Sequence, residues 1–259
     1  MDLAYTAAGL AVGFIVGLTG VGGGSLMTPL LVLVFGISPA IAVGTDLLYA
    51  AITKAGGTWV HAMRKTVNWR VAGLLAIGSL PASVATTLAL KSLAPDVTEL
   101  STLITTMLGV ALILTAGALL FKDKLRELSR QRASHHEGWS KRTTSIVTVL
   151  MGVVLGVLVT ISSVGAGALG AAMLFFLYPR LTSVQIVGTD IVHAVPLTAV
   201  AGLGHVALGS VDYSLLGSLL LGSLPGIYLG SHLAAKIPER VLRPTLAGML
   251  VLIGGKLVF

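Results

Sequence analysis

Near the start of the chain lies the stretch Gly20-Val21-Gly22-Gly23-Gly24-Ser25, inside an apolar run from Leu3 to Phe35. At about 1.5 Å per helical residue this run would be about 50 Å long, whereas the hydrocarbon core of a bilayer is about 30 Å thick. Glycine is the residue most able to leave a helical conformation. The stretch therefore predicts a broken helix whose freed main-chain N–H groups could bind an anion.

The composition places that break inside a membrane protein. The chain has 259 residues, of which 55% are hydrophobic and only 10% are charged. Long uncharged runs predict an all-α polytopic membrane protein with about five segments in each half, some of them part-span. We expect these segments at 3–18, 24–36, 38–60, 67–90, 98–121, 144–161, 167–178, 181–206, 212–235 and 240–258.

The two halves of the chain repeat. Val43-Gly44-Thr45-Asp46 recurs as Val187-Gly188-Thr189-Asp190, and Gly78-Ser79-Leu80-Pro81 recurs as Gly222-Ser223-Leu224-Pro225, both at an offset of 144 residues. A second glycine-rich stretch, Val164-Gly165-Ala166-Gly167-Ala168, matches the first at an offset of 143. Broken segments at matching places in two halves predict a transport site near the membrane midplane.

Charges then divide and orient the chain. We expect a first membrane repeat at 1–121, a basic cytoplasmic linker at 122–142 and a second membrane repeat at 143–259. The basic joints at 61–70, 122–142 and 236–243 are predicted to face the cytoplasm, and the joints at 91–97 and 207–212 to face outward. Equivalent joints then lie on opposite sides, which predicts an inverted repeat.

Composition also excludes several function classes. The chain has no cysteine, which excludes disulfides, thiol chemistry and cysteine-ligated metals. The net charge of +7 is explained by the positive-inside rule, and no basic arm with interleaved aromatics suggests a nucleic-acid partner. We expect no cofactor and no metal. We expect a multi-pass protein of the cell (inner) membrane, for which a homodimer is compatible with the sequence.

The glycine stretch with its following proline, Gly20 to Pro29, resembles the TauE/SafE family of sulfite and organosulfonate exporters. The repeated Val-Gly-Thr and Gly-Ser-Leu-Pro words are similar to that family too, and the resemblance covers almost the whole chain. It implies a permease that moves small sulfur-containing oxyanions, such as sulfite or sulfoacetate, most often outward. Family members often have serine where this chain has Asp46 and Asp190.

The glycine breaks are the first candidate binding sites, as two anion cradles built from main-chain N–H groups with hydroxyl donors beside them. The alternative is that glycine only lets helices approach closely. The predicted substrate-binding residues are Gly20, Gly22, Gly23, Gly24, Ser25, Thr45, Ser162, Ser163, Gly165, Gly167 and Thr189.

A second candidate group could carry protons, because ionisable side chains inside a membrane are expensive and usually functional or paired. It comprises Asp46, Asp190, His193 and Lys54. Each has a structural alternative. The aspartates could cap their helices, Lys54 could extend to the membrane surface, and His193 could be a satisfied interior histidine. His61 and His205 lie near predicted helix ends, where placement at the interface is expected.

The predicted function is therefore export of a small sulfur-containing oxyanion, by alternating access and with protons as the candidate coupling ion. The alternatives are a passive anion channel and a divalent-metal carrier using Asp46, Asp190, His193 and His61. A membrane hydrolase is not expected, because the sequence has neither a His-Glu-x-x-His helix nor a Gly-x-Ser-x-Gly elbow.

Overall fold

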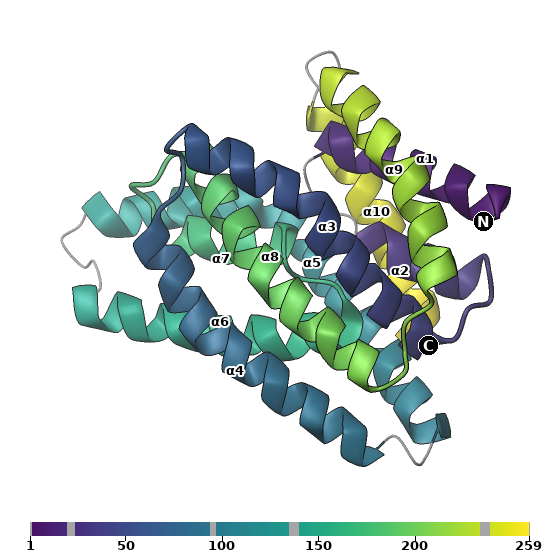
Figure 1. The fold of residues 1–259 in the computed structure, drawn as a ribbon. Coiled ribbons are helices and arrows are strands. Elements are labelled where there is room, and N and C mark those ends of the chain that lie inside the picture. Colours follow the sequence, from purple (N-terminus) through teal and green to yellow (C-terminus); the bar gives the residue numbers. More distant parts are fainter. Residues whose placement is uncertain (1, 20–23, 94–96, 135–139, 234–238, 259) are drawn as a thin grey trace.

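The computed structural model describes residues 2–19, 24–93, 97–134, 140–233 and 239–258, and these residues form ten α-helices and no strand. Each helix matches one of the expected apolar segments to within a few residues, except that α5 is longer at its C-terminal end (Figure 1). The helices are α1 (Leu3–Thr19), α2 (Gly24–Leu33), α3 (Pro39–Met63), α4 (Trp69–Leu93), α5 (Val97–Ser134), α6 (Lys141–Ser162), α7 (Ala168–Leu177), α8 (Ser183–Ala207), α9 (Tyr213–Leu233) and α10 (Glu239–Val258).

The predicted class of all-α polytopic membrane protein is confirmed. Among the described residues, α4, α5, α6, α8 and α9 each contain a span long and apolar enough to cross a membrane, and shorter apolar helices lie at 3–18, 168–177 and 244–258. Large apolar side chains point outward, including Leu3 (87% exposed) and Leu252 (77% exposed). Such an apolar exterior suits contact with lipid.

Local sequence signals set several helix ends. Pro39 opens α3, where its missing N–H needs no partner. Ser140 caps α6 by accepting a hydrogen bond from the N–H of Thr143, and Thr182 forms a capping box with Gln185 at the start of α8. These caps fix where the transmembrane helices begin.

The basic region after residue 121 begins as a continuation of α5, which runs on to Ser134. Lys122 and Arg126 on this extension lie over the ring of Phe175 in α7, with the Lys122 nitrogen 4.7 Å from the ring centre. Cation–π contacts of this kind stabilise the extension against the helix bundle. The assignment of 122–142 as a cytoplasmic linker between two repeats stays a prediction.

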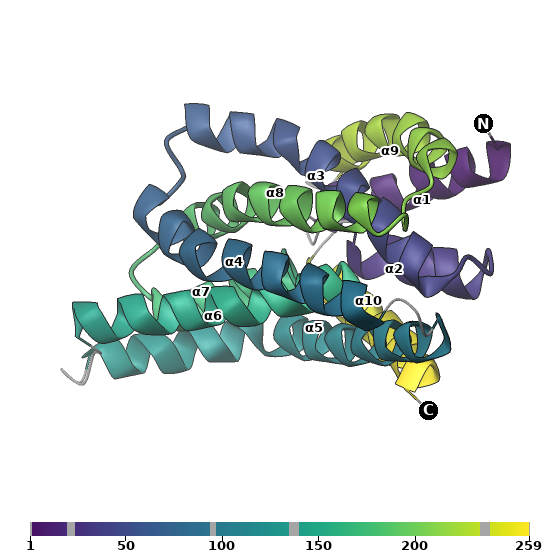
Figure 2. The same ribbon diagram turned by 60° about the horizontal axis from the view of Figure 1, so that its bottom comes forward.

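The packing of the helices is reciprocal between the halves. At the 144-residue offset of the repeats, α1 is the counterpart of α6, and α4 is the counterpart of α9. The two most extensive helix contacts each join one half to the other: α1 packs on α9, and α4 packs on α6 (Figure 1; Figure 2). In both pairs, glycines of one helix lie against main-chain atoms of the other helix, and the residue numbers on the two helices increase together from one contact to the next. These contacts include Gly9 with Leu219, Gly13 with Ser223, Gly152 with Leu75 and Gly156 with Ser79. Each pair therefore runs parallel.

The central pair, α3 and α8, runs in opposite directions. Gly44 near the start of α3 meets Ser210 after the end of α8, while Gly188 near the start of α8 meets Thr66 after the end of α3. α3 and α8 are counterparts in the two repeats. Because they are antiparallel, a two-fold axis that superposes one half on the other would run perpendicular to these helices. This arrangement is the one that an inverted repeat predicts, and the inversion across a bilayer stays a prediction.

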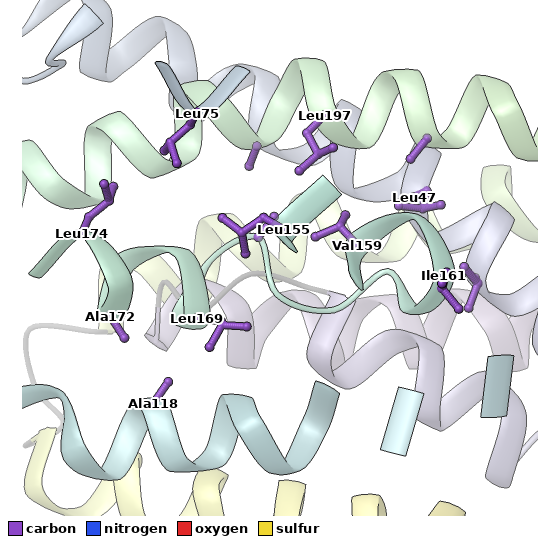
Figure 3. Close-up of a cluster of buried hydrophobic side chains, with 14 of the residues drawn as sticks. Leu47, Leu75, Ala118, Leu155, Val159, Ile161, Leu169, Ala172, Leu174 and Leu197 are labelled. Carbon is purple, nitrogen blue, oxygen red and sulfur yellow. The ribbon is translucent and has the colours of Figure 1, made fainter. Parts of the chain in front are cut away.

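Buried apolar side chains form two clusters around the central pair. One is centred on α6, α7 and α8, where Leu155, Leu169 and Leu197 lie around the connection between α6 and α7 (Figure 3). The other joins α1, α2, α9 and α10. Because α3 contributes Leu47 to the first cluster and Tyr49 to the second, it lies between them and can bring residues of both halves together.

Candidate functional site

The helix break predicted for the second half lies between α6 and α7. Ser163 adopts a left-handed conformation with φ of 58°, and Gly165 and Gly167 follow with φ of 123° and 139°. Side chains other than glycine rarely adopt the last two conformations. The segment 163–166 is buried, so the chain leaves helical geometry inside the protein.

Hydrogen bonds hold the two sides of this break and leave its centre open. Ser162 Oγ donates to the carbonyl oxygen of Leu158 at 2.7 Å and accepts from the N–H of Val164 at 3.2 Å. The N–H of Gly170 donates to Gly165 at 3.0 Å. Within the described part of the chain, the N–H groups of 165–169 have no acceptor. They are main-chain donors at the start of α7, where a helix attracts anions.

Lys54 reaches this break from α3. Its Nζ donates to the carbonyl oxygen of Ala166 at 2.7 Å, so the side chain lies along the protein interior and not toward the membrane surface. Asp46 and Asp190 both act on it electrostatically, yet neither carboxylate lies within ion-pair distance of its nitrogen. An ammonium group has three donors, so Lys54 can bind an anion while it keeps its contact with Ala166.

Asp46 lies inside α3 and is fully buried. Thr28 of α2 donates its hydroxyl hydrogen to Asp46 Oδ2, while Oδ1 has no partner among the described residues. The hydroxyl of Ser163 lies near the same carboxylate but has no hydrogen-bond partner within the described residues. The capping alternative does not hold, because Asp46 is well past the first turn of its helix.

Asp190 occupies the equivalent place inside α8, with only 2% of its surface exposed. Its carboxylate lies against Gly170 in the first turn of α7, so closely that a Cβ atom on that glycine would collide with Oδ1. Asp190 Oδ1 has no hydrogen-bond partner among the described residues. Like Asp46, this residue cannot be a helix cap.

His193 is buried beside Asp190 on α8, and its Nε2 lies 2.8 Å from the hydroxyl oxygen of Ser79 in α4. Its other ring nitrogen has no partner within the described residues. His205 lies in the last turn of α8, as expected, but it is 1% exposed, and its Nε2 lies 2.9 Å from the carbonyl oxygen of Thr160. The close approach of Gly44 to its side chain explains that burial. The placement of His205 at the membrane interface stays a prediction.

Thr45 and Thr189 use their hydroxyl oxygens to join the two halves. Thr45 Oγ1 accepts from the N–H of Asp212 at 3.0 Å, and Thr189 Oγ1 accepts from the N–H of Asn68 at 2.9 Å. Asp212 and Asn68 also cap the first turns of α9 and α4 through their side chains. These contacts give both threonines a packing role, and their predicted role in binding substrate stays a prediction.

The structure thus gathers much of the predicted site at one place. The residues that meet around the α6–α7 break are Ser162, Ser163, Gly165, Gly167, Lys54, Asp46 and Asp190, with His193 on the next turn of α8. Gly20, Gly22 and Gly23 lie outside the described residues, Gly24 begins α2, and Ser25 is buried next to it. Sequence reasoning missed Thr28 and Gly170, which contact the two aspartates.

The site offers little to a metal ion. No group of three or more His, Asp or Glu side chains that could hold a metal occurs among the residues described. The donors around the break are main-chain N–H groups, hydroxyls and an ammonium, which suit an anion.

Comparison with known proteins agrees with this picture. The model of the sulfite exporter TauE/SafE family matches residues 5–257. A probable membrane transporter protein of Bacillus subtilis (strain 168), YjnA, is 41% identical over 262 residues that cover all of both chains. Another from that organism, YdhB, is 28% identical over 250 residues, which cover 93% of this chain and 96% of YdhB. No solved structure matches this chain. The chain belongs to the TauE/SafE family of membrane transporters.

Proposed function

We propose that this protein exports small sulfur-containing oxyanions, such as sulfite or an organosulfonate like sulfoacetate, across the cell membrane. The transport proceeds by alternating access and is coupled to protons. The observation that carries the proposal is the α6–α7 break, where the main-chain N–H groups of 165–169, which have no acceptor among the described residues, lie beside Lys54. Family membership supports the substrate class, since the family model is that of a sulfite exporter.

The donors at the break match the chemistry of a sulfur oxyanion. A sulfite or sulfonate group presents three oxygens, each able to accept hydrogen bonds from main-chain N–H groups in a strongly curved segment. Lys54 adds a positive charge, and Ser163 adds a buried hydroxyl oxygen that has no hydrogen-bond partner in the described residues. The N-terminal end of α7 favours negative charge at the same place.

Proton coupling is supported by the ionisable groups around that break. Asp46, Asp190, Lys54 and His193 come from the central helices α3 and α8. The two aspartates and His193 are buried, and Lys54 is half-buried with its nitrogen bonded to Ala166. Inside a membrane such groups mark ion or proton pathways. Because α3 and α8 belong to opposite halves, movement of one half against the other would change the surroundings of this group.

The test is efflux from proteoliposomes loaded in turn with sulfite, sulfoacetate, sulfate, thiosulfate or a divalent metal ion. We expect efflux of sulfite or sulfoacetate, accelerated when the same anion is present outside, as carriers show. An efflux rate that does not depend on the anion outside would favour the channel alternative. Movement of metal ions without movement of any oxyanion would refute the proposal.

Two glycine variants test whether oxyanion flux requires the α6–α7 break. Gly167→Ala places a side chain at φ of 139°, next to the donors, whereas Gly217→Ala on α9 meets nothing within 4 Å. We expect the first variant to insert in the membrane and lose most of its flux, and the second to transport like the natural chain. Normal flux through Gly167→Ala would remove the break from the mechanism.

A further inference from the structure

Both repeated aspartates lie against a short helix of their own half, α2 for Asp46 and α7 for Asp190. Asp46 accepts the hydroxyl hydrogen of Thr28 on α2, and Asp190 lies against Gly170 on α7. The start of a helix attracts negative charge, so a carboxylate in its first turn takes the place that a bound anion would take. When it is ionised, Asp190 is therefore an anion held beside the donors of the α6–α7 break.

The two aspartates differ in how they are held. Thr28 gives Asp46 a hydrogen-bond donor, but α7 (Ala168–Leu177) contains no hydroxyl residue. At the 143-residue offset of the glycine breaks, the counterpart of Thr28 is Ala171. Asp190 Oδ1 consequently has no partner among the described residues. A buried carboxylate oxygen without a donor is costly, and a proton is one way to relieve that cost.

The charged and titratable groups around Asp190 can be named from each helix packed on α8. From α3, Lys54 acts on Asp190 electrostatically, Asp46 acts on Lys54, and His61 lies against Gly188, two residues before Asp190. On α8 itself, His193 lies one turn away and contacts Ser79 of α4. α7 has no ionisable side chain near the site, and α6 contributes only the uncharged Ser162 and Thr160 to its buried end.

The balance of charges around Lys54 then links binding of the anion to binding of a proton. With both aspartates ionised, Lys54 faces two negative charges, and a third anion at the start of α7 would be repelled. With Asp190 protonated, the charge of Lys54 is balanced by the Asp46 carboxylate alone. The main-chain N–H groups of the break are then available to the substrate. We propose that Asp190 competes with the transported anion for the start of α7, so that an anion binds only when Asp190 carries a proton. The inference rests on the proposed function and assigns the coupling to one residue.

The test is binding of sulfoacetate, whose charge is constant across neutral pH, to the purified protein by calorimetry from about pH 6 to about pH 8. Where Asp190 is mostly ionised, the binding-competent fraction falls about tenfold per pH unit, so we expect the apparent Kd to rise by about that factor. Asp190→Asn should bind with a Kd that is nearly independent of pH. Asp212→Asn is the matched control, because the equivalent Asn68 caps its helix with an amide. It should keep the natural pH dependence.

A second variant keeps the test decisive if Asp190→Asn does not fold. Asp190→Ser removes the same carboxyl group and leaves a smaller polar side chain beside Gly170. We expect this variant also to bind sulfoacetate with a Kd that is nearly independent of pH. The natural pH dependence in either Asp190 variant, or its loss in Asp46→Asn while Asp190→Asn keeps it, would overturn the assignment.

Flux measurements separate failure of this inference from failure of the proposed function. In proteoliposomes, sulfoacetate efflux by the natural chain should carry protons and change the internal pH, while Asp190→Asn should exchange sulfoacetate without proton movement. Absence of any oxyanion flux in the natural chain would refute the proposed function. Oxyanion flux with the same proton movement in both proteins would refute only the role of Asp190.

Discussion

Gly222 on α9 gives the sharpest prediction about how the helices pack. A Cβ atom added there would lie 2.7 Å from the main-chain nitrogen of Leu10 and closer still to the carbonyl oxygen of Thr6, whereas ordinary contact begins at 3.4 Å. These are main-chain atoms of α1, which cannot rotate away as a side chain can. Gly222→Ala therefore forces α1 and α9 apart by about 1 Å, and overpacking of this kind costs about 1–3 kcal/mol.

The effect can be measured as a shift in thermal unfolding of the detergent-purified protein. For a chain of this size, a loss of about 2 kcal/mol lowers the Tm by about 4–8 °C. Gly217→Ala on the same helix meets nothing within 4 Å and should leave the Tm unchanged or slightly higher. Gly78→Ala should lower it as Gly222→Ala does, because a Cβ there lies 2.9 Å from the nitrogen of Val153 on α6. Equal melting of Gly222→Ala and Gly217→Ala would refute the described contact of α1 with α9.

Three further substitutions test individual contacts. Thr45→Val removes the acceptor of the Asp212 N–H and should lower the stability by about 1 kcal/mol in a thermal or denaturant melt, and an unchanged melt would show that this contact is unimportant. Thr28→Val leaves Asp46 without its donor and should lower the stability by about 1–3 kcal/mol in the same melt, and a melt like that of the natural chain would show that the Thr28 hydroxyl does not stabilise Asp46. Lys54→Met removes the half-buried charge beside the break and should weaken sulfoacetate binding by about tenfold to a hundredfold in calorimetry, and unaltered binding would place the anion elsewhere.

The helix order was predictable because bilayer thickness and punctuation by glycine and proline constrain it locally. The segment expected at 181–206 is α8 (Ser183–Ala207), whose start follows from the capping pair of Thr182 and Gln185. The end of α5 was less predictable, since charge alone does not end a helix. No glycine or proline interrupts 122–134, and contact with Phe175 supports the extension.

The site was predictable as a set of residue types and not as a set of contacts. The glycines marked the break, but the acceptor of Lys54 is Ala166, which lies in the other half of the chain. The burial of His205 depends on the close approach of α3 to α8, which no local pattern encodes. One signal was available: Asn68 and Asp212 stand at the repeat offset of 144 residues, as do the threonines that they contact.

The repeated Val-Gly-Thr-Asp word performs two tasks through adjacent residues. Its glycine and threonine hold the turn that enters α4 or α9 of the opposite half, and its aspartate faces the short helix of its own half. Because α3 and α8 run in opposite directions, the Thr45–Asp212 contact and the Thr189–Asn68 contact lie at opposite ends of the central pair. If one half rocks against the other, each end can open only when its own contact separates. Both contacts are formed in this structure. Under the proposed mechanism we therefore expect each open state to have lost one of them, and an anion and the proton on Asp190 to be carried together while both are formed.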